Sequence, residues 1–197
     1  MGDWAHATNP SGAATTSTTS VANTNLRLGA TVDVEAGVTA SASANADDTT
    51  NTGSADDEDG VTMPASITQN ANTTLPISVF NNTGATAYLN AWIDFNNNGV
   101  LTDAGEQIII NDPMTTGTNG VNKAYTFTVP TVAAIGTVGA RFRLTSIPNP
   151  GSTGSSGTGE AEDYTITIAE PSDRGDYSLF QDASSKISSA LKLGDFT

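Results

Sequence analysis

The chain has 197 residues, of which 37% are hydrophobic and only 14% are charged, and its formal net charge is −14. Because nucleic acids and anionic membranes are negatively charged themselves, this field disfavours both as partners and favours divalent cations. The sequence has no Cys, which excludes disulfides and thiolate metal sites, and no apolar run approaches the ~20 residues that a membrane helix needs.

The chain begins with a polar stretch, residues 1–25, which we predict to be a long loop or loosely packed arm because it has almost no apolar pattern. Residues 36–60 are small and acidic. The segments between and after these stretches alternate apolar and polar residues, which predicts strands. The expected strands cover residues 26–29, 31–35, 75–80, 86–94, 107–111, 123–129, 138–144 and 163–169.

The alternation also predicts which side chains are buried. In residues 138–144 the inward face would carry Val, Ala, Phe and Leu, with Arg141 and Arg143 facing outward. Short strands joined by Gly, Asn and Pro turns are typical of sandwiches. We therefore predict an all-β chain, an antiparallel β-sandwich of Ig-like or jelly-roll-like kind with long acidic and polar loops. Helical periodicity is found only in residues 184–191.

The two ends of the sequence resemble each other. Gly2-Asp3-Trp4 recurs as Gly175-Asp176-Tyr177, and Leu26-Arg27-Leu28-Gly29 recurs in the same order as Leu191-Lys192-Leu193-Gly194. The alternative is chance similarity between short Gly-containing segments. We interpret the pattern as one full repeat followed by the start of another. The predicted domains are a polar arm (1–25), a sandwich domain (26–170), and a linker with the start of the next repeat (171–197).

The sharpest chemical motif is the segment of residues 94–106. It has oxygen-bearing side chains at its first, third and fifth positions and Gly at its sixth, which is how calcium loops begin. It departs from an EF-hand because Glu106 is the thirteenth residue, not the twelfth. The predicted calcium ligands in this segment are Asp94, Asn96, Asn98, the carbonyl of Val100, Asp103 and Glu106. The alternative is an Asn-rich hairpin closed by side-chain-to-backbone hydrogen bonds.

A second acidic group precedes the regular strands. Asp56, Asp57 and Asp59 lie in a run of carboxylates that repel one another unless they are solvated or bridged by cations. We count these three as candidate metal ligands. The alternative is a flexible, solvated acidic loop.

A third acidic group leads into the last predicted strand. Glu160, Glu162 and Asp163 are candidate metal ligands, since one of these carboxylates could close a metal site. The competing interpretation is a cross-strand ion pair between Glu160 or Glu162 and Arg141 or Arg143.

Catalysis has little support in the sequence, and we expect no enzyme. The only histidine, His6, lies in the polar arm, where nothing fixes it for acid–base work. Glu160 and Glu162 are conceivable as a glycosidase pair, but no deep cleft is indicated. Trp92 shares a strand face with Tyr88, and it would either stack on a sugar or pack as a buried ring.

Several spaced motifs agree with one family. They are Ala91-Trp92-Ile93-Asp94-Phe95-Asn96-Asn97-Asn98-Gly99, Gly105-Glu106, Val129-Pro130, Arg141-Phe142-Arg143 and Gly159-Glu160-Ala161-Glu162-Asp163-Tyr164. In this order they resemble the bacterial GEVED domain, which is named for the last motif, here with Ala161 where Val is usual. The resemblance spans roughly residues 26–169, because residues 28–35 and the DDEDGV segment of residues 56–61 also look like the segment that precedes this domain. It implies an extracellular β-sandwich in large, often repetitive surface or secreted proteins of bacteria, and it names no ligand.

Motifs and resemblance together predict a calcium-binding structural repeat, an extender or spacer of a secreted bacterial adhesin or cell-surface protein. The expected cofactor is Ca²⁺, and the expected partners are neighbouring repeats of the same chain. We expect a monomeric, extracellular module on the bacterial cell surface that binds no nucleic acid and does not insert into membranes. The alternative is a calcium-dependent carbohydrate-binding β-sandwich module that holds a surface glycan.

Overall fold

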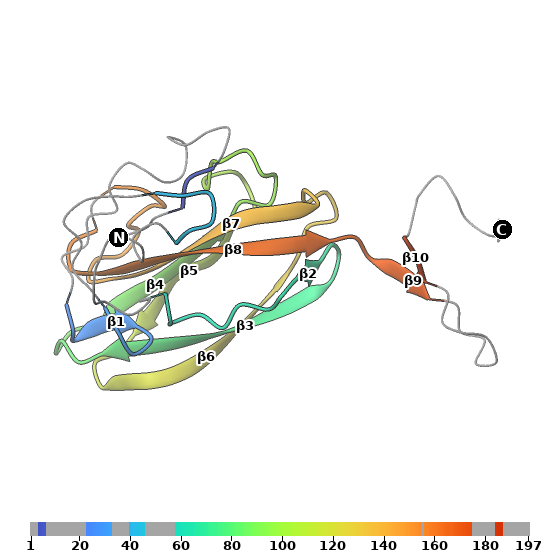
Figure 1. Cartoon of the computed structure of the whole chain (residues 1–197). Helices are drawn as coiled ribbons and strands as arrows, with labels where there is room; N and C mark the ends of the chain where they lie inside the picture. The colour runs from blue at the N-terminus through green and yellow to red at the C-terminus, as the bar shows by residue number, and fades with distance from the viewer. Residues whose placement is uncertain are drawn as a thin grey trace.

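The computed structural model of the chain describes residues 4–6, 23–32, 40–45, 58–154, 156–174 and 184–186. Its strands form a five-stranded and a three-stranded sheet that face each other, with a separate two-stranded pair beyond one end (Figure 1). Within these ranges there is no helix, and so none that could cross a membrane. The predicted all-β sandwich is therefore confirmed.

The five-stranded sheet is antiparallel except at one edge. Its strands, in spatial order, are β2 (Ile67–Thr68), β8 (Gly159–Ala169), β7 (Gly136–Thr145), β4 (Ala87–Ile93) and β5 (Gln107–Met114). Only the short β2 runs parallel to its neighbour, β8. Both β4 and β7 lie inside the sheet, so each pairs with a strand on either side.

The three-stranded sheet has the order β1 (Leu26–Leu28), β3 (Asn72–Asn81) and β6 (Thr118–Thr128). Both long strands extend beyond the predicted ranges, because their ends carry Thr, Asn and Gly, which pair through the backbone without any apolar alternation. The register of β3 and β6 shifts between Val79 and Phe80. The short β1 adds to the other edge of β3.

One hydrophobic core fills the space between the sheets. Its largest fully buried side chains are Leu26, Leu28, Leu75, Ile77, Leu89, Ile93, Met114, Phe142 and Leu144. Burying one such side chain is worth about 1.5–3 kcal/mol. The three-residue β1 is therefore held largely by its two leucines, and the predicted inward face of residues 138–144 is confirmed.

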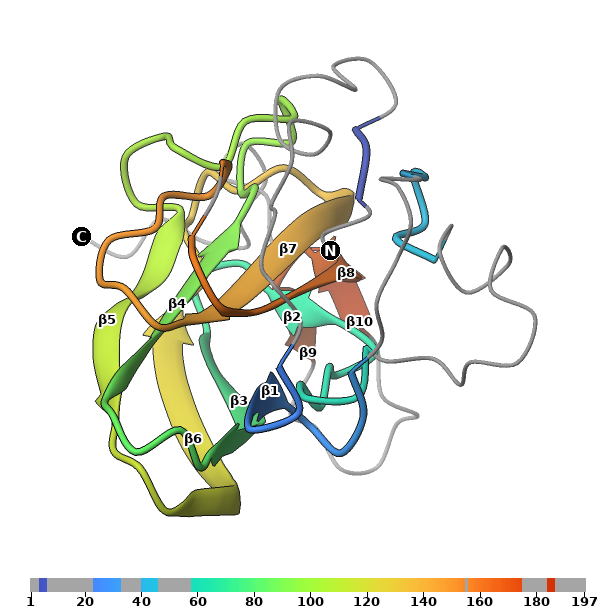
Figure 2. The same cartoon turned by 90° about the vertical axis from the view of Figure 1, so that its left-hand side faces the viewer.

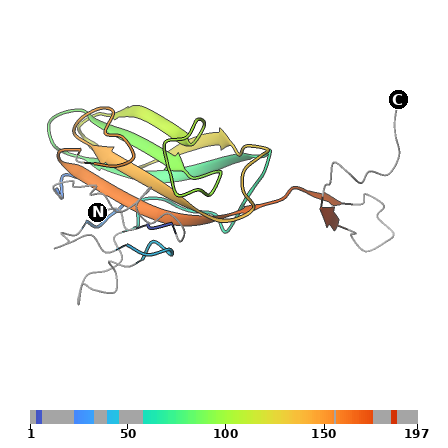
Figure 3. The ribbon, with the colours of Figure 1, turned by 90° about the horizontal axis from the view of Figure 1, so that it is seen from above.

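A second, smaller hydrophobic group lies on the other face of the five-stranded sheet. This outer cluster consists of Trp4, Ala44, Trp92 and Leu101, all buried. Trp92 reaches it because it alternates with the core residues of β4. Residues 4–6 and 40–45, which lie next to each other beside β7 and β8 in Figures 2 and 3, join through the Ala5 N–H, which donates to the Ser41 carbonyl at 2.8 Å.

Two predicted elements differ from the structure. Residues Ser184–Lys186 of the expected helix form β10, which pairs with β9 (Ser172–Arg174), and the rest of that helix lies outside the described residues. The helical prediction is wrong for these three residues, because the apolar stripe that suggested it begins only at Ile187. The strand expected over residues 31–35 is also absent at Thr31 and Val32. The chain turns away after β1 at Gly29, whose φ is 57°.

Candidate metal centre

The loop of residues 94–106 joins β4 to β5 and closes around the carboxylate of Asp94. This side chain is fully buried, with Oδ1 accepting the backbone N–H of Asn98 (3.1 Å) and Oδ2 that of Gly99 (2.8 Å). Gly99 supports the turn with a φ of 79°, a conformation that costs Gly little. Burial raises the pKa of Asp94, and these backbone N–H groups act in the opposite direction because they favour its ionised form.

Two amide side chains in the same loop converge on one carboxylate oxygen. The Nδ2 groups of Asn96 and Asn98 each donate to Oδ2 of Asp103 at 2.7 Å, and these hydrogen bonds, that from Asn96 first, lower the pKa of Asp103. The amide oxygens of Asn96 and Asn98 accept backbone N–H groups at 3.0 and 2.8 Å. The loop thus brings together the side chains that were predicted as calcium ligands. It also contains the side-chain-to-backbone hydrogen bonds that the alternative, an Asn-rich hairpin, predicts.

Glu106 closes the loop with an unsatisfied oxygen. The residue is 2% exposed, its Oε2 accepts the backbone N–H of Asp103 (3.2 Å), and its buried Oε1 has no hydrogen-bond partner. Burial, together with the negative charge of Asp94, raises the pKa of Glu106 to about 7. Burial also raises the pKa of Asp94. A cation placed here would favour both ionised forms and would satisfy the orphaned oxygen.

Carboxylates alone do not make up this centre. Within the described ranges, no three His, Asp or Glu side chains are gathered as a metal ion would require. Calcium sites commonly combine carboxylates with amide and backbone carbonyl oxygens. In this loop those are the oxygens of Asn96 and Asn98 and the carbonyl of Val100, whose N–H donates to Asn98 Oδ1.

The second acidic group is placed elsewhere. Asp59 holds the turn after β1, where its Oδ1 accepts the backbone N–H of Ala30 (2.9 Å) and its Oδ2 accepts the hydroxyl of Thr31 (3.0 Å). Asp56 and Asp57 lie outside the described residues. The part of this group that the structure describes therefore serves as a clamp on the backbone.

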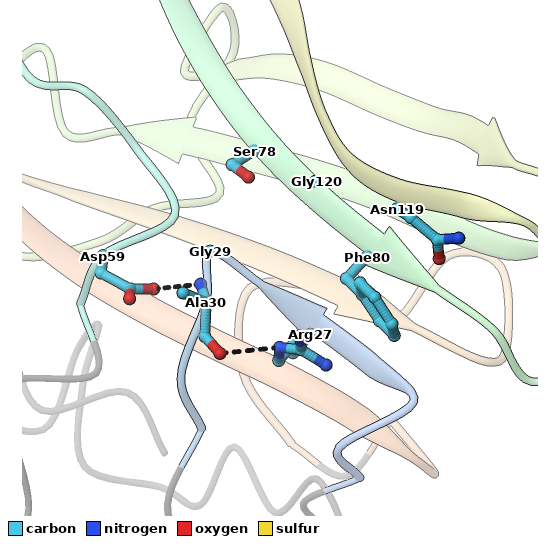
Figure 4. A pocket seen from close by; sticks show the side chains of 8 residues that line it. All are labelled: Arg27, Gly29, Ala30, Asp59, Ser78, Phe80, Asn119 and Gly120. Atoms are coloured by element: carbon cyan, nitrogen blue, oxygen red, sulfur yellow. Dashed lines mark hydrogen bonds between the residues drawn. The ribbon is translucent and has the colours of Figure 1, made fainter.

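A shallow hollow on the three-stranded sheet lies beside that clamp (Figure 4). The Arg27 guanidinium lies 3.8 Å over the centre of the Phe80 ring, and its Nε donates to the Ala30 carbonyl at 3.1 Å. Asp59 flanks the same turn from the other side in Figure 4. These contacts hold β1 and its turn against β3. The charged side chains that line the hollow therefore stabilise the fold.

The carboxylates of residues 159–164 face alternately to the two sides of β8. Glu160 and Glu162 point to the inner side, where Glu160 Oε2 accepts the backbone N–H of Leu28 and Glu162 Oε1 accepts that of Gly60 (3.0 Å). A Cβ on Gly60 would lie 2.4 Å from Cβ of Leu28, so this crossing needs Gly. The two glutamates therefore bind two upstream segments to the sandwich.

The ion pair of this motif uses a different acid from the predicted one. Asp163, on the outer face, accepts the Nε and Nη2 groups of Arg141 at 2.7 Å each, and both side chains are fully buried. The cross-strand pair predicted for Glu160 or Glu162 with Arg141 or Arg143 is wrong, because the glutamates lie on the opposite face of the sheet.

Sequence reasoning missed the role of Arg143. It was expected to face solvent, yet it is fully buried, and burial and the nearby Arg141 lower its pKa to about 10. It donates to backbone carbonyls of the β7–β8 loop, namely those of Pro150 (3.3 Å), Gly151 (2.7 Å), Thr153 (3.4 Å) and Gly154 (2.8 Å). The signal that could have found it is the presence of two arginines on one strand of a chain with only seven Lys and Arg residues.

Trp92 packs as a buried ring. It is 3% exposed and lies in the outer cluster with Leu101, a residue of the β4–β5 loop. A hollow beside this loop is lined by Trp92, Asp103, Gln107 and Asn149, among others. The indole presents no open face for stacking on a sugar.

The fold and the loop together define an all-β sandwich whose β4–β5 connection gathers carboxylate and amide side chains. Residues 88–167 match the family model described as the GEVED domain, which confirms the resemblance for these residues. The matched stretch runs from β4 to β8 and includes both the loop and the motif of residues 159–164. No curated protein matches the chain.

Proposed function

We propose that the β4–β5 loop binds one calcium ion and that the domain is a calcium-stabilised structural module. The carrying observation is the buried Oε1 of Glu106, which has no hydrogen-bond partner in a loop that already gathers Asp94 and Asp103. A buried carboxylate oxygen without a donor costs stability, and a hard cation is the partner that the neighbouring oxygens suit.

The charge of the loop supports the same proposal. Residues 94–106 contain three carboxylates and neither Lys nor Arg, in a chain of net charge −14. Burial raises the pKa of both Asp94 and Glu106, and the negative charge of Asp94 raises that of Glu106 further. A divalent ion would offset this repulsion and draw the start and the end of the loop together.

For the role of the module we propose a spacer in an extracellular bacterial surface protein. The GEVED domain, the similar ends of the sequence and the cation-seeking charge support it. Extracellular modules bind calcium with dissociation constants of ~10⁻⁴–10⁻³ M, so the ion would be bound outside the cell. We propose no catalytic role, because Glu160 and Glu162 are buried and accept backbone N–H groups.

Thermal unfolding with calcium and with chelator tests the proposal. If the dissociation constant is ~10⁻⁴ M, ~10 mM calcium stabilises the fold by about 2.7 kcal/mol, which raises Tm by about 5–10 °C. Asp94→Ala should remove most of this shift. Glu58→Ala, which removes a carboxylate from the acidic run of residues 56–59 outside the loop, should remove much less of it. Asp112→Asn is the matched control, since Asp112 pairs with Lys123 (2.6 Å) away from the loop; it should keep the full shift. A wild-type Tm that does not respond to calcium would end the proposal.

The glycan-binding alternative has less support than it had from the sequence. It relied on Trp92 as a stacking platform, and that ring is buried in the outer cluster. Binding to a glycan array that is lost on chelation would restore it.

A further inference from the structure

The outer face of β7 and β8 holds an aromatic ring from the N-terminal end of the chain. Trp4 is 3% exposed, and its backbone N–H donates to Oδ2 of Asp163 at 2.8 Å. Its indole lies directly over Gly139, where an added Cβ would lie 2.1 Å from Cε2 of the ring. We call this place the aromatic socket. Its base is Gly139, where any side chain would clash with the ring, and the buried Asp163 carboxylate accepts the backbone N–H of the segment that carries the ring.

The N-terminal segment contacts the sandwich at a second point as well. Leu26 and Leu28 of β1 enter the core, and the Leu28 N–H donates to Glu160. Trp4 and β1 are thus two separate contacts between the first 30 residues and the sandwich, and both end on carboxylates of the motif that names the family.

These two contact elements are the two short motifs that recur near the C-terminus. Gly175-Asp176-Tyr177 repeats the segment around Trp4, and Leu191-Lys192-Leu193-Gly194 repeats β1 and its turn. If the similarity were due to chance, the repeated motifs would not be expected to coincide with the two segments that contact the sandwich. In this chain the socket and the β1 position are already filled by Trp4 and β1. Both positions that such a copy would take on this sandwich are therefore occupied.

We infer that residues 175–194 are a docking segment for a second sandwich of the same kind, with Tyr177 entering the aromatic socket of that domain. The segment would then hold that second sandwich as Trp4 and β1 hold this one, through an aromatic ring and an added strand. The inference rests on the repeat in the proposed function and not on calcium, so the two can fail separately.

Substitution at Trp4 in the full chain tests whether a tyrosine fits the socket. Trp4→Tyr gives the first segment the same Gly-Asp-Tyr sequence as the tail, and it should melt close to the wild type. Trp4→Ala should melt about 5–10 °C lower, because it empties a packed aromatic site. If Trp4→Tyr melts as low as Trp4→Ala, Tyr177 cannot fill such a socket and the inference is overturned.

Cross-linking tests docking between two copies, and the absence of native Cys makes any disulfide unambiguous. The acceptor chain carries Thr137→Cys at the exposed rim of the socket, with Trp4→Ala to empty it and Tyr177→Ala to disable its own tail. The donor carries Ser178→Cys. We expect a disulfide-linked acceptor–donor dimer, formed several-fold more slowly by a donor that also carries Tyr177→Ala. Formation of this dimer should be suppressed when the acceptor keeps Trp4, because the socket is then filled.

The comparison of the two donors is made both in calcium and in chelator. Equal dimer yields from the donors with and without Tyr177 would overturn the inference, whatever the calcium titration shows. A missing calcium shift alongside a Tyr177-dependent dimer would instead remove only the metal proposal.

Discussion

Replacing Glu106 by Gln should stabilise the protein without calcium and destabilise it with calcium. The carboxyl has a pKa of about 7 in the folded chain against 4.5 in a free side chain, because it is buried beside Asp94. A folded pKa above the unfolded one means that stability is present below pH 4.5 and is lost as the pH rises through 7. The difference corresponds to about 3 kcal/mol at pH 8. Gln carries no charge, so this loss is absent from Glu106→Gln.

The assay is urea unfolding of both proteins between pH 4.5 and 8, in chelator and in ~10 mM calcium. In chelator the wild type should weaken across this range and Glu106→Gln should not, so the variant is the more stable of the two at pH 8. In calcium the order should reverse, because the wild-type carboxylate gains a cation that the amide holds less well. Parallel pH profiles of the two proteins in chelator would refute the reasoning about Glu106. The reasoning would also be refuted if the wild type had the larger free energy of unfolding at pH 8 both in calcium and in chelator.

The remaining predictions concern the motif on β8 and its partners. Asp163→Asn leaves the buried Arg141 without its counter-charge and should cost about 3–5 kcal/mol of unfolding free energy in denaturant titrations; a loss below 1 kcal/mol would contradict the buried pair. Gly60→Ala forces Cβ against Leu28 and should lower Tm by several degrees at any calcium concentration. Arg143→Lys keeps the charge but cannot reach the same carbonyls, so amide hydrogen exchange should rise in the β7–β8 loop while the calcium shift is unchanged.

Alternation in the sequence was enough to predict the sandwich. The strand centres were found because apolar residues such as Val138 and Phe142 repeat with a period of two. The ends of the strands were not found. The early residues of β6, from Thr118 to Asn122, are polar or exposed and pair with β3 through the backbone alone. Such backbone pairing leaves no pattern in the local sequence, so these strand ends could not be predicted.

The loop of residues 94–106 was predictable as a cluster because its oxygen-bearing side chains are close in sequence. The partners of the β8 motif were not, since Leu28 and Gly60 are 132 and 102 residues away from the glutamates that hold them. The choice of Asp163 over Glu162 for the ion pair could have been deduced. A period of two along β8 places Glu162 on the same face as Tyr164 and Ile166, and Asp163 on the other face with Arg141.

The outer cluster has a practical consequence. Trp4 and Trp92 are the two tryptophans of the chain, and both lie in this one small group. The ultraviolet emission of the intact protein therefore comes from the junction between its N-terminal segment and the β4–β5 loop, and it reports little on the main core. A red shift of that emission would show the junction opening while the sandwich is still folded, without any added label.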